Sequence, residues 1–121
     1  MAIAELTAVT LDCPDARRLA AFYQGLLGGE VRTESDNWIE LVIDGAPSLG
    51  FQQVAAYTPP TWPVGDVPTQ VHLDLQVGDL DAAEAGALAL GASVLDAGDT
   101  TRSWRVYADP AGHPFCLVAH H

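Results

Sequence analysis

Apolar and polar residues alternate along two short stretches of the chain that resemble each other. Ala8–Asp15 and His72–Asp79 both alternate and then reach a Pro-Asp or Gly-Asp break, and the second begins 64 positions after the first. Alternation over this length is typical of a half-buried strand. The aspartate that ends each stretch is a favoured N-cap residue of a helix. The chain therefore contains an internal repeat, and each copy opens with a strand that leads into a helix.

Helical periodicity follows each of these breaks. In the first copy Leu19, Phe22 and Leu26 share one helical face, and a pair of glycines ends the run. In the second copy an alanine-rich stretch ends at Gly91, and glycine is the residue expected where a helix stops. Gly86, inside this second helix, indicates close packing on the sheet because glycine is otherwise unfavourable there.

Three further strand-like stretches follow each predicted helix, separated by turn residues. In the first copy they are Glu30–Glu34, Trp38–Ile43 and Ser48–Val54, and in the second Ser93–Asp96, Trp104–Ala108 and Pro114–Ala119. Trp38 and Trp104 occupy equivalent places 66 positions apart, and so do Gly50 and Cys116. Each copy therefore predicts the order strand, helix, strand, strand, strand.

The repeat also predicts the domain organisation. A length of 121 residues suits one domain, which we expect to span 1–121 with modules at 1–56 and 69–121. A linker at 57–68 joins them, and its proline-rich start, residues 57–63, cannot be a central strand.

The sequence HLDLQV (72–77) opens the second copy and DPAGHPFCLV (109–118) closes it. With the duplicated pattern, these motifs resemble the vicinal oxygen chelate superfamily, in its glyoxalase-like or bleomycin-resistance-like branch. The superfamily also contains extradiol dioxygenases and fosfomycin-modifying enzymes. The resemblance implies an α+β fold in which two βαβββ modules form a cup-shaped mixed sheet with helices on its outer face. One fold carries many functions, so the motifs favour the fold and leave the reaction open.

Strand alternation predicts which side chains face the cup. Trp38 and Trp104 fall on the concave side as aromatic walls, and Trp62 of the linker could cover the mouth. Core packing is the alternative for each tryptophan. Polar side chains with the same phase are Thr10, Asp12, Glu40, Gln52, His72 and Asp74. An apolar wall with a few polar groups is typical of a small-molecule pocket. Arg105 falls on the opposite, helix side, and the sequence shows no partner for it.

Metal-dependent members of the superfamily place one His, Gln or Glu ligand at each of four equivalent positions. The resemblance assigns these positions to Ala8, Gly50, His72 and Cys116. Alanine and glycine offer no ligand atom, so we predict neither a metal nor another cofactor. The sequence leaves open whether His72 and Cys116 hold a residual metal. Without a metal, His72 either orients a ligand by hydrogen bonds or acts as an acid or base with Asp74 beside it.

Charge and composition exclude several classes of partner. Five arginines and no lysine face 16 acidic residues, which gives a net charge of −11. Such a chain is unsuited to nucleic acid and to anionic membrane surfaces. No apolar run approaches the ~20 residues of a membrane span. Cys13 and Cys116 are far apart and form no disulfide framework, so we expect a reduced, cytoplasmic protein.

Three functions are compatible with these features. The favoured one is a binding protein that sequesters an aromatic, neutral or cationic ligand in the cup, like the drug-binding members of the superfamily. Its expected contacts are Thr10, Trp38, Glu40, Gln52, Trp62, His72, Asp74, Trp104 and Cys116. The alternative is a glyoxalase-like lyase or isomerase, or a dioxygenase, with His72 as metal ligand or as acid or base. The third is a cup that only supports a dimer. We expect a homodimer in any case, because open sheet edges favour pairing.

Overall fold

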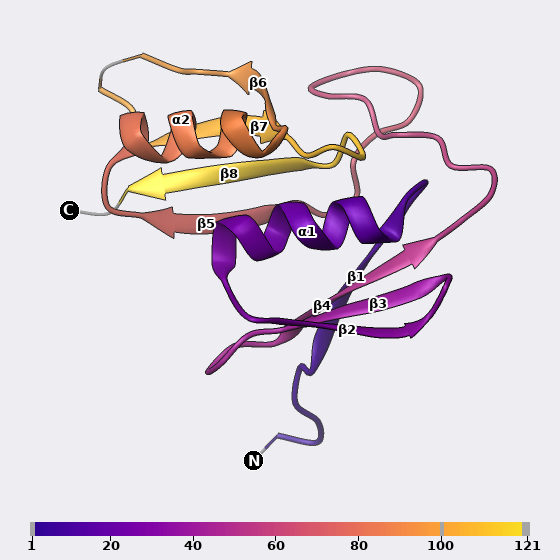
Figure 1. Cartoon of the computed structure of the whole chain (residues 1–121). Coiled ribbons are helices and arrows are strands. Elements are labelled where there is room, and N and C mark those ends of the chain that lie inside the picture. The colour runs from indigo at the N-terminus through magenta and orange to yellow at the C-terminus, as the bar shows by residue number, and fades with distance from the viewer. Residues whose placement is uncertain (1, 100, 120–121) are drawn as a thin grey trace. The chain divides into compact units, whose positions relative to one another are not determined.

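The structure, a computed structural model, describes residues 2–99 and 101–119. The chain divides into two compact units, with the boundary between Tyr57 and Thr58. Within the described residues, each unit has one helix and one four-stranded mixed sheet in the order strand, helix, strand, strand, strand (Figure 1). The predicted α+β pair of βαβββ modules is therefore confirmed. No helix among the described residues has the length and hydropathy needed to cross a membrane.

The first unit forms its sheet in the order β1-β4-β3-β2. Its elements are β1 (Ala8–Cys13), α1 (Ala16–Leu27), β2 (Glu30–Ser35), β3 (Trp38–Val42) and β4 (Ser48–Gln53). β1 runs parallel to β4, and the other neighbours are antiparallel. The Asp15 carboxylate caps α1 by accepting the Arg18 N–H at 3.1 Å. On the sheet side of α1, the ring of Tyr23 stacks on Phe51 with centroids 5.8 Å apart.

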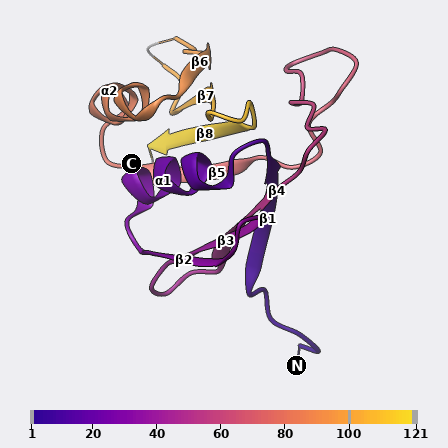
Figure 2. The same cartoon turned by 45° about the vertical axis from the view of Figure 1, so that its right-hand side comes forward.

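The second unit repeats this arrangement with the order β5-β8-β7-β6. Its elements are β5 (Leu73–Val77), α2 (Leu80–Leu90), β6 (Ser93–Asp96), β7 (Trp104–Ala108) and β8 (Pro114–Ala119). β5 and β8 are the parallel pair, and α2 lies against one face of this sheet (Figures 1 and 2). Asp79 caps α2, and Gly91 ends it with φ +119°, a left-handed conformation that favours glycine.

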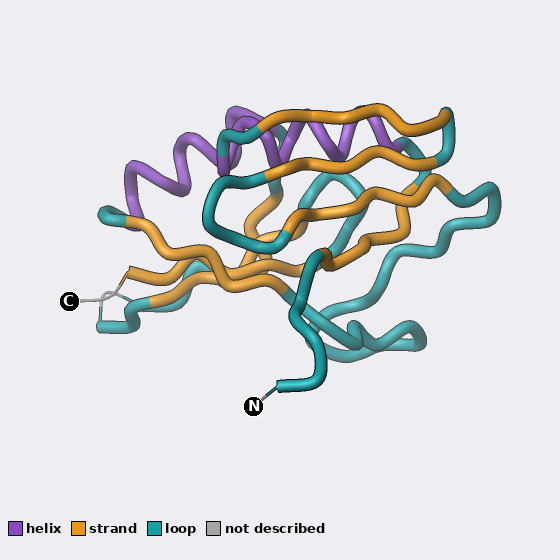
Figure 3. The backbone as a smooth tube through the Cα atoms, turned by 90° about the horizontal axis from the view of Figure 1, so that it is seen from below, coloured by secondary structure: helices purple, strands orange, loops and turns teal. Residues whose placement is uncertain are grey.

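The segment between β4 and β5 contains neither helix nor strand in the described chain and appears as a long loop in Figure 3. Its proline-rich part, expected as a linker, falls within the second unit from Thr58 onward. β5 begins at Leu73, so His72 lies one residue before the strand and not inside it. The other strands begin where the alternation predicts and end within one residue of it.

The two helices bury their apolar residues to different extents. α1 buries Leu19, Phe22 and Tyr23 almost completely, whereas among the described residues of α2 only Ala87 is fully buried. The expectation for Gly86 is wrong, because a Cβ at this position would meet no described heavy atom within 4 Å. α2 is therefore held less by apolar packing than α1.

Polar contacts hold α2 to the sheet and explain Arg105. The guanidinium of Arg105 lies on the helix side of β7, 2.8 Å from the Asp81 carboxylate and 3.4 Å from that of Glu84. Tyr107, two residues on, donates its hydroxyl to Glu84 at 2.8 Å. Burial, together with this hydrogen bond, raises the pKa of Tyr107 to about 12. Arg105 thus lies between apolar neighbours because α2 supplies two carboxylates opposite it.

Candidate functional site

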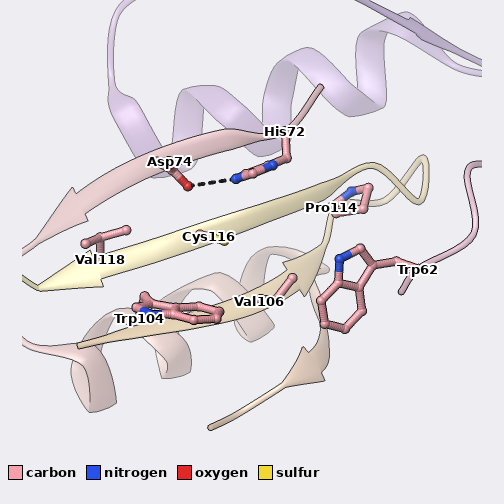
Figure 4. A pocket seen from close by; sticks show the side chains of 8 residues that line it. All are labelled: Trp62, His72, Asp74, Trp104, Val106, Pro114, Cys116 and Val118. Atoms are coloured by element: carbon pink, nitrogen blue, oxygen red, sulfur yellow. Dashed lines mark ion pairs between the residues drawn. The ribbon is translucent and has the colours of Figure 1, made fainter. Parts of the chain in front are cut away.

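A pocket of about 480 Å³ lies on the second unit's sheet (Figure 4). The side chains that line it are Trp62, His72, Asp74, Trp104, Val106, Pro114, Cys116 and Val118. Five of them are contacts expected from the sequence: Trp62, His72, Asp74, Trp104 and Cys116. The volume is within the range of small-molecule sites, roughly 300–1,000 Å³.

Strand register brings most of these side chains together. In the sheet, Cys116 of β8 is paired with Asp74 of β5 on one side and with Val106 of β7 on the other. Trp104 is paired with Val118 in the same way. Side chains on one face of a sheet alternate with those on the other, and Arg105 meets α2 on the helix side. The pocket residues of β5, β7 and β8 therefore form a row on the face opposite α2.

Trp62 reaches the pocket from a closed loop and not from a strand. Thr61 forms an isolated bridge with Pro68, and its N–H donates to the Val67 carbonyl at 2.6 Å. The Thr61 hydroxyl also accepts the Val67 N–H at 3.3 Å. These bonds close the loop immediately beside Trp62. In Figure 4 the indole lies beside Pro114 at one end of the pocket.

His72 and Asp74 form the polar part of the pocket. The Nε2 atom of His72 lies 3.2 Å from the Oδ1 atom of Asp74 (dashed line in Figure 4). Both side chains are about half exposed, so they can reach a bound molecule as well as each other. A carboxylate that accepts one ring N–H fixes the orientation of the imidazole and leaves its other nitrogen for a ligand.

Cys116 lies beneath this pair and is 9% exposed. Burial raises the pKa of its thiol to about 11, and the nearby Asp74 carboxylate adds to the increase. The thiol is therefore neutral at physiological pH, whereas the thiolate is the reactive form of cysteine. Cys116 supplies shape and polarisability to the floor of the pocket and no activated nucleophile.

The remaining contacts expected from the sequence belong to the first unit. They are Thr10, Trp38, Glu40 and Gln52, and none of them is among the described residues that line the pocket. A Cβ atom built on Gly50 would lie 2.8 Å from the Thr10 hydroxyl and 2.9 Å from the indole of Trp38. The Trp38 ring therefore packs directly over Gly50, and this close contact requires glycine.

Arg102, which belongs to none of the motifs in the sequence, contacts a wall of the pocket. Its guanidinium carbon lies 3.8 Å from the centroid of the Trp104 ring. The sequence feature that could have indicated Arg102 is the length of the connection before β7, the strand that begins with Trp104. It spans 36–37 in the first unit and 97–103 in the second, so the repeat marks the second connection as an insertion.

The four metal-ligand positions that the resemblance implies do not fit this chain. Ala8 has no donor atom, and the space above Gly50 is filled by Trp38 and Thr10. In the second unit His72, Asp74 and Cys116 bring one donor atom each to within 4.8 Å of one another. Zinc bonds of about 2.0–2.3 Å would place tetrahedral ligand atoms roughly 3.3–3.8 Å apart. This smaller cluster would have to contract and lose the thiol proton to bind such an ion.

The duplicated βαβββ fold matches that of the vicinal oxygen chelate class. Residues 8–118 match the sequence model of the glyoxalase-like domain. The chain therefore belongs to the glyoxalase-like domain family. No curated protein matches the sequence.

Solved structures support the same fold. The chain is 22% identical to a glyoxalase/bleomycin resistance protein/dioxygenase family enzyme from Burkholderia phytofirmans, with a TM-score of 0.75 over 96% of this chain and 98% of that chain. An antibiotic-binding protein from a Streptomyces species is 21% identical, with a TM-score of 0.67 over 100% and 99% of the two chains. A fosfomycin resistance protein from Listeria monocytogenes is 18% identical, with a TM-score of 0.75 over 99% and 94%.

Proposed function

We propose that the protein binds a small planar aromatic molecule in the pocket of the second unit and sequesters it without changing it chemically. The observation that carries this proposal is a pocket bounded by two tryptophans, with a single polar pair at one side. The antibiotic-binding protein of the same fold lends support.

The balance of apolar and polar groups favours binding by stacking and burial. Val106, Val118 and Pro114 add aliphatic surface to the pocket lining. A ligand ring in contact with an indole gains about 0.5–1.5 kcal/mol beyond the burial of its area. The His72–Asp74 pair offers one hydrogen-bonding group for orientation. The net charge of −11 favours neutral or cationic molecules over anions.

A fluorescence titration with a panel of aromatic natural products tests this proposal. We expect saturable binding that weakens at least about tenfold in Trp104→Ala, because stacking and burial are lost together. His72→Ala should weaken binding less, by the value of one hydrogen bond. Trp38→Phe is the matched control, since Trp38 lies over Gly50 and not in the pocket. Saturable binding that is unchanged in both Trp104→Ala and His72→Ala would place the site elsewhere.

An enzyme is the second candidate, and the His72–Asp74 pair is the observation that favours it. An imidazole held by a carboxylate is suited to proton transfer near neutral pH. Mass spectrometry of the titrated molecules after incubation tests this candidate. A product that forms with the unmodified protein, and not with a His72→Ala variant that still binds, would replace sequestration by catalysis.

A further inference from the structure

We infer that Arg102 positions the indole of Trp104 and selects neutral, electron-rich aromatic ligands over cationic ones, an inference that rests on the proposed binding function. Of the described residues, Trp104 lines the pocket and Arg102 does not. Arg102 stacks 3.8 Å from the ring centroid, so its guanidinium covers one face of the indole.

The guanidinium of Arg102 is anchored on several sides. Its Nε donates to the Trp104 carbonyl at 2.8 Å, and Nη1 donates to an Asp96 carboxylate oxygen at 3.1 Å. Nη2 lies 3.1 Å from the other oxygen of the same carboxylate. Only 23% of the arginine side chain is exposed. A planar fork held at this many points fixes both the plane and the location of the charge over the ring.

The connection before β7 folds so that the Arg102 side chain reaches the Trp104 ring. The Asp99 carboxylate accepts the backbone N–H groups of Thr101 and Arg102, at 2.8 and 3.1 Å. These bonds close a turn immediately before Arg102. Gly98 has φ +66°, and a Cβ there would lie 2.6 Å from the guanidinium. The backbone therefore approaches the charged group as closely as glycine allows.

The first unit shows why Trp104 needs such a partner. Trp38, its equivalent, lies over Gly50, where a Cβ would meet the ring. Cys116 stands at the position equivalent to Gly50, so the same placement of the ring is blocked in the second unit. Trp104 remains 40% exposed and stacks on Arg102 instead. The position equivalent to Arg102 in the first unit is Asp36, which offers no cation.

A cation on one face of an indole changes what the other face attracts. The negative face of the ring is already engaged by Arg102. A second cation stacked on the free face would lie roughly 7 Å from the guanidinium carbon, at ordinary ring separations of about 3.5 Å. The Asp96 carboxylate balances part of this charge, but the guanidinium still draws π-electron density toward its own face. The free face therefore attracts a cationic ring less, whereas a neutral electron-rich ring stacks favourably on the polarised indole. Among the described residues that line the pocket, Asp74 alone carries a carboxylate, and this carboxylate is paired with His72.

The positioning role is tested without any ligand. In a Trp38→Phe/Trp62→Phe background, Trp104 is the only tryptophan, and its emission reports the environment of this ring. We expect Arg102→Gln and Asp96→Asn to shift the emission maximum and to lower its anisotropy, because the ring loses its stacking partner. Arg102→Lys should restore part of the effect, and Arg17→Gln, at an exposed arginine of α1, should have none. Emission and anisotropy unaltered by Arg102→Gln would overturn the positioning role.

Selectivity is tested by calorimetric titration of two bicyclic aromatic probes of similar size, neutral 2,6-dihydroxynaphthalene and cationic N-methylquinolinium. The unmodified protein should bind the naphthalene more tightly, and Arg102→Gln should reduce this preference about three- to tenfold. Arg17→Gln should keep it. The same preference in Arg102→Gln and in the unmodified protein would overturn the selective role. If the unmodified protein binds neither probe, the selective role and the proposed function fail for this ligand class, while the emission measurement still decides the positioning role.

Discussion

At the scale of single residues, the side chain across the strand decides how each tryptophan packs. Gly50 leaves room for the Trp38 ring, whose nearest atom lies 2.9 Å from where a Cβ would stand. The equivalent Cys116 removes this room, and Trp104 stays 40% exposed beside the pocket. One methylene and a sulfur atom thus separate a packing tryptophan from one that can meet a ligand.

Gly50→Ala should destabilise the protein by about 1–3 kcal/mol, because the new methyl group overpacks a filled site. The Trp38 ring and the Thr10 hydroxyl must both move to accommodate it. Gly86→Ala is the matched control, since its Cβ would meet no described atom and lies inside α2. That variant should gain up to about 1 kcal/mol from helix propensity. Urea unfolding measures both, and equal stability of Gly50→Ala and the unmodified protein would contradict the close contact.

The donor cluster of His72, Asp74 and Cys116 gives a further prediction at this scale. We expect no stoichiometric transition metal in protein purified gently, because two of the four family positions carry no donor and the Cys116 thiol holds its proton. Adding Zn²⁺, Ni²⁺ or Mn²⁺ should leave Tm nearly unchanged, since an ion that binds the folded state must raise it. Elemental analysis that finds close to one metal per chain, lost in His72→Ala, would favour the enzyme.

At the scale of helices and strands, the two units use different forces to hold their helix. α1 buries large apolar side chains against its sheet. Among its described residues α2 fully buries only Ala87, and it is tied to β7 by the contacts of Asp81 and Glu84 with Arg105 and Tyr107. A polar network therefore replaces part of the apolar interface in the second unit.

Arg105→Gln should lower the free energy of unfolding, because Asp81 and Glu84 lose their cation and the Arg105 side chain is only 18% exposed. Arg105→Lys keeps the charge without the planar fork and should lose less. Arg17→Gln makes the same change of net charge at an exposed site and should be nearly neutral. Chemical unfolding of the three variants measures this order. A loss in Arg105→Gln no larger than in Arg17→Gln would show that the network contributes nothing.

The elements were predictable from sequence because alternation and helical periodicity are local and occur twice. The partners of Arg105 were not, since they depend on the rotation of α2 over the sheet. Arg102 was missed for a related reason: its stacking on Trp104 depends on how the longer connection folds. Asp74 lies beside Cys116 because of strand register, and His72, one residue before β5, keeps the alternation that the sequence shows. The closed loop that carries Trp62 depends on hydrogen bonds of Thr61 that no periodicity reveals.

At the scale of the whole molecule, exposed edges and charge act in opposite directions. In the described chain each sheet ends in edge strands, β1 and β2 in the first and β5 and β6 in the second. Apolar side chains of the second unit are also exposed: Leu88, Leu90, Val94 and Leu95. Both features favour association, whereas a charge of −11 on each chain opposes it.

We therefore predict a homodimer whose stability increases with salt. Screening shortens the range of the repulsion to about 8 Å at physiological ionic strength, while the apolar contacts are retained. Light scattering at micromolar concentrations should give the mass of two chains, with more monomer at low salt. A monomer mass at all salt concentrations would refute the homodimer.

The surface connection that carries Arg102 has a consequence for evolution. Residues 97–103 join two strands and include no fully buried side chain among those described. Mutations and changes of length there escape most of the purifying selection that protects a core, since loop extension costs little free energy. A gene of this kind can therefore acquire a new ligand preference by drift in one short connection, while selection continues to maintain the two sheets unchanged.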